Sequence, residues 1–160
     1  MSTEVIIANY LDHKQADDIV YLLNYYAEEP MGGGQPLSEH ARANLAPELA
    51  KIPYAFSVLC YIDGKPAGLA NCFVSYSTFK CKPLINIHDL VVVSDYRGKG
   101  LSQKLLEKVE AIATSKGCCK ITLEVLAGNT IAQNAYLKYG FEPYKLNEED
   151  GNAEFWQKPL

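Results

Sequence analysis

The stretch Ser94-Asp-Tyr-Arg-Gly-Lys-Gly-Leu-Ser-Gln103 decides the fold of this chain. An apolar run at residues 90–93 leads into it, and apolar residues at helical spacing follow it, so the sequence predicts a strand, a tight turn and a helix. Gly98 and Gly100 let the backbone approach a bulky partner, because glycine has no Cβ atom. The first N–H groups of a helix lack intrahelical acceptors and lie at the positive end of its dipole. The turn therefore predicts a binding site for a phosphate-bearing ligand.

Two common phosphate-binding motifs do not fit this turn. The P-loop requires a glycine at position 93, which is Val93, and Ser or Thr after Lys99, where Gly100 stands. The dinucleotide-binding fingerprint requires a third glycine at position 103, which is Gln103. Neither class of nucleotide-binding protein is therefore indicated.

The pattern that does fit is Arg-x-x-Gly-x-Ser over residues 97–102. It resembles the pyrophosphate loop of the GNAT superfamily of N-acetyltransferases, whose pattern is Gln/Arg-x-x-Gly-x-Gly/Ala. Ser102 departs from the last position, but serine is also a small residue. The resemblance implies that the phosphate-bearing ligand is coenzyme A.

A second motif strengthens the resemblance. The late signature of the superfamily is a strand, then Asn-x-x-Ala-x-x-x-Tyr, with Gly-Phe four and five residues after the Tyr. The sequence fits this spacing without a gap, through Asn129, Ala132, Tyr136, Gly140 and Phe141. The resemblance is firm over residues 85–145, whereas the first half of the chain shares only the order of its predicted elements.

Length and composition suit a single domain over residues 1–160 with one substantial core. The chain is 48% hydrophobic and 21% charged, which is typical of soluble proteins. It has no apolar run of the roughly 20 residues that a membrane helix needs, and no signal peptide pattern. Its five cysteines include no CxxC pair, which predicts reduced thiols and no metal site. The net charge of -4 argues against a nucleic-acid partner. We expect a cytoplasmic protein with neither a nucleic-acid nor a membrane partner.

The predicted elements follow the order β-α-α-β-β-β-α-β-α-β-β, which is also the order of the superfamily. Strands are expected at residues 4–10, 54–62, 67–76, 85–93, 120–126, 142–146 and 153–158. Helices are expected after Asp12, from Ser38 to about Lys51, from the turn to Gly117, and at residues 130–139. This pattern predicts an α+β, GNAT-like acyl-CoA N-acyltransferase fold, in which about four helices flank a mixed, mostly antiparallel sheet.

The resemblance implies how acetyl-CoA, the expected co-substrate, would be held. The backbone of Leu90, Val91 and Val92 would pair with the pantetheine arm like a missing strand, and an N–H near Val92 would polarise the thioester carbonyl. Arg97 and Lys99 would add positive charge, or are solvated loop residues. Asn129 would contact the coenzyme or cap the following helix. The pyrophosphate would bind the N–H groups of the turn, which belong to Gly98, Lys99, Gly100, Leu101, Ser102 and Gln103.

Tyr136 is the predicted general acid, because the superfamily places a Tyr here near the coenzyme sulfur. A phenol with a pKa of about 10 can return a proton to a thiolate. The general base is left open between Glu124 and Asp89, with His88 as a third candidate and a water relay as a further alternative. Neighbours along a strand point to opposite faces, so we do not expect His88 and Asp89 to face the same cleft.

The sequence therefore predicts an acetyl-CoA-dependent N-acetyltransferase that transfers acetyl directly to a primary amine of a small molecule, such as a polyamine, an amino acid or an aminoglycoside-like compound. Two alternatives are a protein N-terminal or lysine acetyltransferase, and a non-catalytic acyl-CoA-binding sensor. A homodimer is possible, as in the superfamily.

The residues that select the acceptor are expected in the first half of the chain. The glycine-rich loop at residues 31–36 suits either a mobile lid or a flexible connector. Tyr21, Tyr25 and Tyr26 either line an acceptor pocket or pack in the core.

Overall fold

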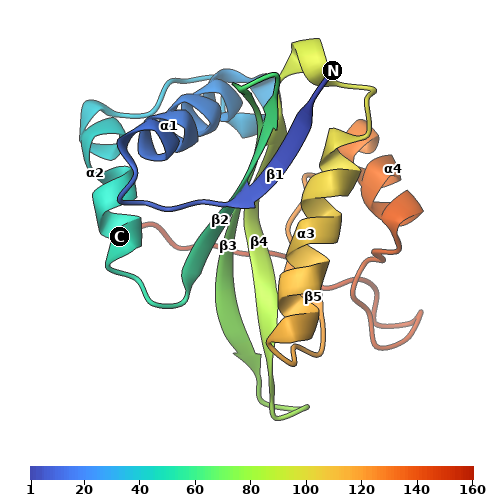
Figure 1. The fold of residues 1–160 in the computed structure, drawn as a ribbon. Coiled ribbons are helices and arrows are strands. Elements are labelled where there is room, and N and C mark those ends of the chain that lie inside the picture. The colour runs from blue at the N-terminus through green and yellow to red at the C-terminus, as the bar shows by residue number, and fades with distance from the viewer. The chain divides into compact units, whose positions relative to one another are not determined.

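The sheet of this protein is built from five strands in the order β1-β2-β3-β4-β5. They are β1 (Thr3–Ile7), β2 (Ala55–Ile62), β3 (Lys65–Ser77), β4 (Lys82–Val92) and β5 (Ile121–Leu123) (Figure 1). The helices are α1 (His13–Glu28), α2 (Glu39–Ala50), α3 (Leu101–Ser115) and α4 (Thr130–Tyr139), with single 3-10 turns at Pro30–Gly32 and Ser94–Tyr96. The computed structural model describes all residues 1–160, which divide into a first unit, Met1–Leu123, and a second unit, Glu124–Leu160. A single domain over residues 1–160 stays a prediction.

The pairing of the strands makes the sheet mixed and mostly antiparallel. Strands β1 to β4 pair antiparallel with their neighbours, and β5 runs parallel to β4. Asp63 and Gly64 join β2 to β3 with φ angles of 49° and 78°, the conformation that a two-residue hairpin turn requires. With its four helices, the chain has the predicted α+β fold class.

Helices cover both faces of the sheet in the first unit (Figure 1). On one face, Ile19 and Leu22 of α1 pack in a buried cluster that includes Leu69 of β3. On the other face lies α3, whose buried side chains include Leu105. Gly68 faces α3 because neighbours on a strand alternate, and a Cβ atom at Gly68 would lie only 3.0 Å from Leu105 Cδ1. The glycine thus allows α3 to pack closely on the sheet.

The helix boundaries predicted from local signals are confirmed. Asp12 caps α1 by accepting a hydrogen bond from Gln15 N (3.0 Å), and Ser38 caps α2 by accepting one from Ala41 N (3.1 Å). Gly140 ends α4 in the left-handed conformation. These residues act on backbone groups within one turn, so the sequence alone places them.

The strands predicted after residue 123 are wrong. Strand β5 ends at Leu123, before the expected boundary at residue 126. The carbonyl groups of Leu126 and Ala127 accept hydrogen bonds from Gln133 Nε2 at 3.0 and 2.8 Å. They are therefore used by α4 rather than by a strand ladder.

The expected strand pair at residues 142–146 and 153–158 is reduced to one bridge, between Lys145 and Asn152. Pro143 cannot donate to a ladder. Between the two segments, Asn147 binds Asp150 through both its side-chain oxygen and its side-chain nitrogen, at 2.9 and 2.6 Å. Local hydrogen bonds of this kind compete with sheet pairing.

All five cysteines are free thiols, and Cys60 and Cys72 are buried. Burial raises the pKa of the Cys72 thiol to about 12, so this residue is an unreactive core side chain. None of the helices combines the length and apolar character needed to cross a membrane.

Candidate functional site

The turn between β4 and α3 has the backbone geometry that the sequence predicts. Gly98 and Gly100 have φ angles of 77° and 76°, and a Cβ atom at either would have nothing within 4 Å. No side chain caps α3, whose first hydrogen bond runs from Lys104 N to Gly100 O (3.1 Å). The N–H groups of the first helical turn therefore lack an intrahelical acceptor and lie beside open space. Binding of the pyrophosphate there stays a prediction.

Arg97 makes contacts that the sequence did not predict. Its Nη2 donates to both carboxylate oxygens of Glu29, at 2.7 and 2.8 Å, and its Nε donates to the Val92 carbonyl at 3.0 Å. The guanidinium charge is thus neutralised by Glu29, just after α1. The ammonium group of Lys99 lies 5.6 Å from the centre of the Tyr96 ring, so Lys99 is the cation of the turn without an ion-pair partner.

The last part of β4 has a free edge within the first unit. Strand β5 pairs with β4 only from Ile85 to Ile87. Beyond that point, Val93 N–H donates to Ala67 O of β3 (2.9 Å). Backbone groups alternate in direction along an antiparallel strand, so the N–H of Val92 points to the other edge, where no strand pairs. This is the edge that the resemblance assigns to the pantetheine arm.

A cavity of about 400 Å³ lies between the α1–α2 segment and strands β3 and β4. Its apolar walls come from Leu23 of α1, Leu37 in the following loop, Leu45 and Leu49 of α2, and Phe73 of β3. Its polar groups belong to Tyr26, Asn71, His88 and Asp89. The cavity joins one predicted base candidate, Asp89, to the first half of the chain, where the acceptor site was expected.

His88 and Asp89 both line this cavity, so the prediction that they face different clefts is wrong. Asn71 pairs with Asp89, whereas the next residue of β3, Cys72, pairs with Ile87. His88 is therefore the extra residue of a β-bulge, which interrupts the strict alternation of side chains.

A chain of hydrogen bonds runs from Tyr10, in the turn between β1 and α1, to Asp89. Asn71 Nδ2 donates to Asp89 Oδ2 (3.1 Å), and Ser57 Oγ donates to Asn71 Oδ1 (2.6 Å). The Ser57 hydroxyl has one proton, so Tyr10 must donate its own to Ser57 Oγ (2.8 Å). Ser57 and Asn71 are buried. None of these three partners was predicted from the sequence, although a Ser and an Asn within apolar strands are unusual enough to indicate a role.

Burial raises the pKa of Asp89, because the charged form loses solvation. The hydrogen bond from Asn71 and the charge of His88 oppose this shift. Burial also raises the pKa of Tyr26, with a further contribution from the charge of Asp89. Asp89 is thus a half-buried carboxylate that retains a proton more readily than a solvated one.

Of the three tyrosines considered for the acceptor pocket, Tyr26 lines the cavity. The hydroxyl oxygen of Tyr25 accepts a hydrogen bond from Ser94 N–H (3.0 Å), at the start of the phosphate turn. Tyr21 is exposed. In the 31–36 loop, Gly32 also lines the cavity; a mobile lid stays a prediction.

Glu124, Asn129 and Tyr136 belong to the second unit. Asn129 Oδ1 accepts a hydrogen bond from Ala132 N (3.2 Å), so it caps α4, one of its two predicted roles. The ring of Tyr136 lies edge-on to that of Phe141, with centres 5.9 Å apart. Glu124 is exposed and follows the end of β5 rather than lying within the strand. The catalytic roles of Glu124 and Tyr136 stay predictions.

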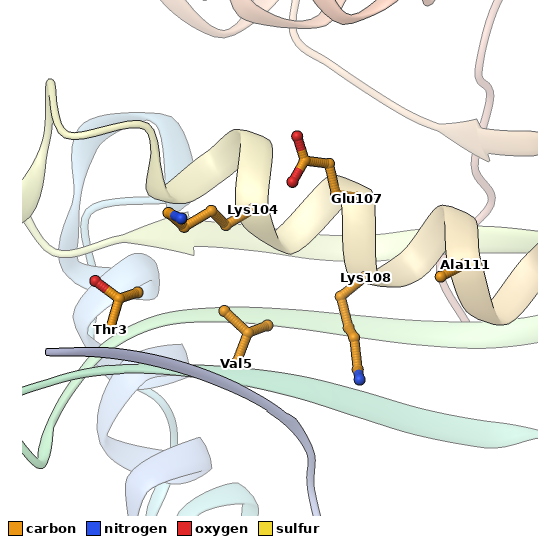
Figure 2. A pocket seen from close by; sticks show the side chains of 6 residues that line it. All are labelled: Thr3, Val5, Lys104, Glu107, Lys108 and Ala111. Carbon is orange, nitrogen blue, oxygen red and sulfur yellow. The ribbon is translucent and has the colours of Figure 1, made fainter.

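A second hollow, of about 340 Å³, lies between β1 and α3 (Figure 2). Figure 2 shows Lys104 and Lys108 of α3 on either side of Val5. None of the residues that the sequence predicts for the site lines this hollow, so we assign it no role.

Comparisons with known proteins agree with this description. A family model described as the acetyltransferase (GNAT) family matches residues 19–141. Thialysine N-epsilon-acetyltransferase from Bos taurus is 37% identical over 84 residues, which are 52% of this chain and 48% of that protein. The chain spans about half the length of the mammalian relatives of this name.

Solved structures match the chain over almost its whole length. A probable acetyltransferase has a TM-score of 0.79 at 19% identity, with 98% of this chain and 99% of that one covered. Aminoglycoside N-acetyltransferase AAC(6')-Iy in complex with CoA has a TM-score of 0.76 at 20% identity, with 99% and 96% covered. At such identities these matches establish the fold, and the expected GNAT-like fold is confirmed.

Proposed function

The chain belongs to the acetyltransferase (GNAT) family, and on that premise we propose that it transfers an acetyl group from acetyl-CoA directly to a primary amine of a small molecule. The observation that carries this proposal is the pairing of an uncapped glycine turn with a cavity that contains one half-buried carboxylate, that of Asp89. Relatives named for amine substrates, thialysine and aminoglycosides, support the reaction class. A cytoplasmic location and a homodimer stay predictions.

The residues of the turn suit coenzyme A. The backbone N–H groups from Gly98 to Gln103 are proposed to bind the pyrophosphate, and Lys99 adds positive charge. The free edge of β4 offers backbone groups of Leu90 to the pantetheine amides, whereas the Val92 carbonyl already accepts a hydrogen bond from Arg97 Nε. When bound, acetyl-CoA supplies the activated acetyl group as a thioester.

The amine nitrogen attacks the thioester carbonyl carbon, so that a C–N bond forms and the C–S bond breaks. The Val92 N–H is proposed to stabilise the negative charge that develops on the carbonyl oxygen. Asp89 binds the incoming ammonium group and accepts its proton, directly or through water. Tyr136, assigned by the family resemblance, returns a proton to the leaving thiolate. Positioning of both reactants supplies several kcal/mol of the barrier reduction.

The experiment that tests this function is a thiol-release assay with purified protein, acetyl-CoA and a panel of amines and peptides. We expect release with small amines, and turnover reduced about 100-fold in Tyr136→Phe, as for loss of a general acid. Tyr21→Phe is the matched control, because Tyr21 is exposed on α1 and is assigned no role. Coenzyme binding without release across the whole panel would instead indicate a non-catalytic sensor, and peptide-only activity a protein acetyltransferase.

A further inference from the structure

The cavity beside β4 contains a single carboxylate. Asp89 is the one acidic residue among those that line it. Asp89 is not a partner in an ion pair. Its hydrogen-bond partner is the neutral amide of Asn71. The charge of His88, which also lines the cavity, lowers the pKa of Asp89 but forms no ion pair with it. A half-buried carboxylate whose hydrogen-bond partner is neutral loses solvation, and a ligand with one ammonium group would reduce that cost.

The two acidic residues at the end of α1 do not line the cavity and have partners of their own. Glu29, which follows α1, is bound by Arg97 through both oxygens. Glu28 accepts a hydrogen bond from Asn24 at 3.1 Å. The lining also contains no Lys or Arg, so a carboxylate on the ligand would find no lysine or arginine to pair with it there.

Apart from Tyr26, Asn71 and His88, the other side chains of the lining are apolar. Leu23, Leu37, Leu45, Leu49 and Phe73 line the cavity around the polar group at Asp89. The volume of about 400 Å³ lies near the lower end of the range of roughly 300–1,000 Å³ for small-molecule sites. Burying apolar ligand surface against such walls is favourable, whereas a second charge there would be desolvated without a partner.

We propose that the acceptor is a primary monoamine with an apolar body, an alkyl chain or an aromatic ring, whose single ammonium group pairs with Asp89. This inference rests on the proposed function and narrows it. It separates this chain from relatives named for aminoglycosides, which are polycationic, and for thialysine, an amino acid with a carboxylate. It also disfavours the polyamines and amino acids that the sequence left open.

The test compares amines that differ by one charged group, using the full chain and acetyl-CoA. Hexylamine is paired with 1,6-diaminohexane, and phenethylamine with phenylalanine. We expect kcat/KM to be at least about tenfold higher for the monoamine in each pair, as for an unpaired group in a buried site. An aminoglycoside such as sisomicin should be a poorer substrate than either monoamine.

The outcomes distinguish the monoamine inference from the proposed acetyltransferase function. Release that favours the diamine, phenylalanine or sisomicin would overturn the monoamine inference and leave the acetyltransferase function standing. Release with no amine in the panel would overturn the proposed function, and the monoamine inference with it.

A variant of the apolar wall gives a second readout. Leu37 is half-buried, and its backbone N–H donates a hydrogen bond to Asn24 Oδ1 (2.9 Å). This bond does not involve the side chain of residue 37, so a substitution there leaves the bond in place. Leu37→Glu adds a second carboxylate to the cavity and should raise the ratio of kcat/KM for 1,6-diaminohexane to that for hexylamine about tenfold. Leu37→Gln is the neutral control and should leave the ratio unchanged. Equal ratios in the two variants would contradict the assignment of this wall.

Discussion

At the scale of single residues, Asp89 is proposed to bind the amine, and its charge lowers the stability of the free protein. Its carboxylate is half-buried and accepts a hydrogen bond from Asn71, which in turn accepts one from Ser57, the partner of Tyr10. This series of hydrogen bonds fixes the position of the carboxylate and polarises the Asn71 amide. It does not replace the solvation that the charged form loses, and the pKa of Asp89 is therefore raised. Sites that bind charged ligands commonly reduce the stability of the free protein in this way.

The free energy of unfolding should consequently increase in Asp89→Asn at neutral pH. A raised pKa means that the folded state holds the proton more tightly than the unfolded chain. Stability therefore falls as the pH rises from the ordinary Asp value of about 4 through the raised pKa. Asn cannot ionise and avoids this loss. Urea unfolding at several pH values should show a gain at pH 7 that shrinks toward pH 4.

Asp17→Asn provides the comparison for this measurement, since Asp17 is exposed on the same layer, in α1. Its stability should match that of the parent protein within a few tenths of a kcal/mol at every pH. An Asp89→Asn variant that is less stable than the parent at pH 7 would show that the hydrogen bond from Asn71 outweighs desolvation.

At the scale of elements, features set by neighbouring residues could be predicted from the sequence, whereas features set by residues far apart in the chain could not. Asp12, Ser38 and the Asp63-Gly64 turn act on backbone within a few residues, so their effects could be read from the sequence. The bulge at His88 depends on the register between β3 and β4, which no single strand encodes. That is why the sequence could name Asp89 as a candidate but wrongly predicted that His88 and Asp89 face different clefts.

The contacts of Arg97 show the same limit. Its partner Glu29 lies 68 residues away in the chain, so only the folded structure identifies the pair. After residue 123 the sequence predicted strands that the structure lacks. Residues that favour strands occur there, but local side-chain hydrogen bonds use the groups that strand pairing would need. The phosphate turn was predictable because two glycines, a preceding strand and a following helix are all local features.

The glycine turn gives an element-scale prediction with a matched control. Gly100 and Gly117 flank α3 with φ angles of 76° and 70°, and a Cβ atom at either would meet nothing within 4 Å. Gly100→Ala and Gly117→Ala should therefore each lower the free energy of unfolding by about 1 kcal/mol, from backbone strain alone. Only Gly100→Ala places a methyl group in the proposed pyrophosphate site, so its Kd for coenzyme A should rise about tenfold or more.

Calorimetric titration with coenzyme A, together with urea unfolding of both variants, separates these effects. Equal Kd values in Gly100→Ala, Gly117→Ala and the parent protein would place the coenzyme elsewhere. Equal losses of stability are the internal check that the two substitutions strain the backbone alike.

At the scale of the whole molecule, the buried core belongs to one of the two units. The buried hydrophobic residues run from Ile19 to Ala113, all within the first unit. The sheet and α3 therefore form the part that apolar burial stabilises. In the second unit no residue is buried, and Phe155 and Trp156 are 74% and 82% exposed. Stability should accordingly differ along the chain.

Native-state hydrogen exchange should reveal that difference directly. Amides in β2, β3, β4 and α3 should exchange only through near-global unfolding, because their hydrogen bonds are covered by the core. Amides of residues 124–160 should exchange much faster, including those of α4, because local opening exposes little apolar surface there. Mass spectrometry of peptic peptides, referenced to a fully denatured sample, measures both groups in one experiment. Protection of α4 equal to that of β3 would mean that the second unit unfolds together with the first, and that the chain behaves as one cooperative domain.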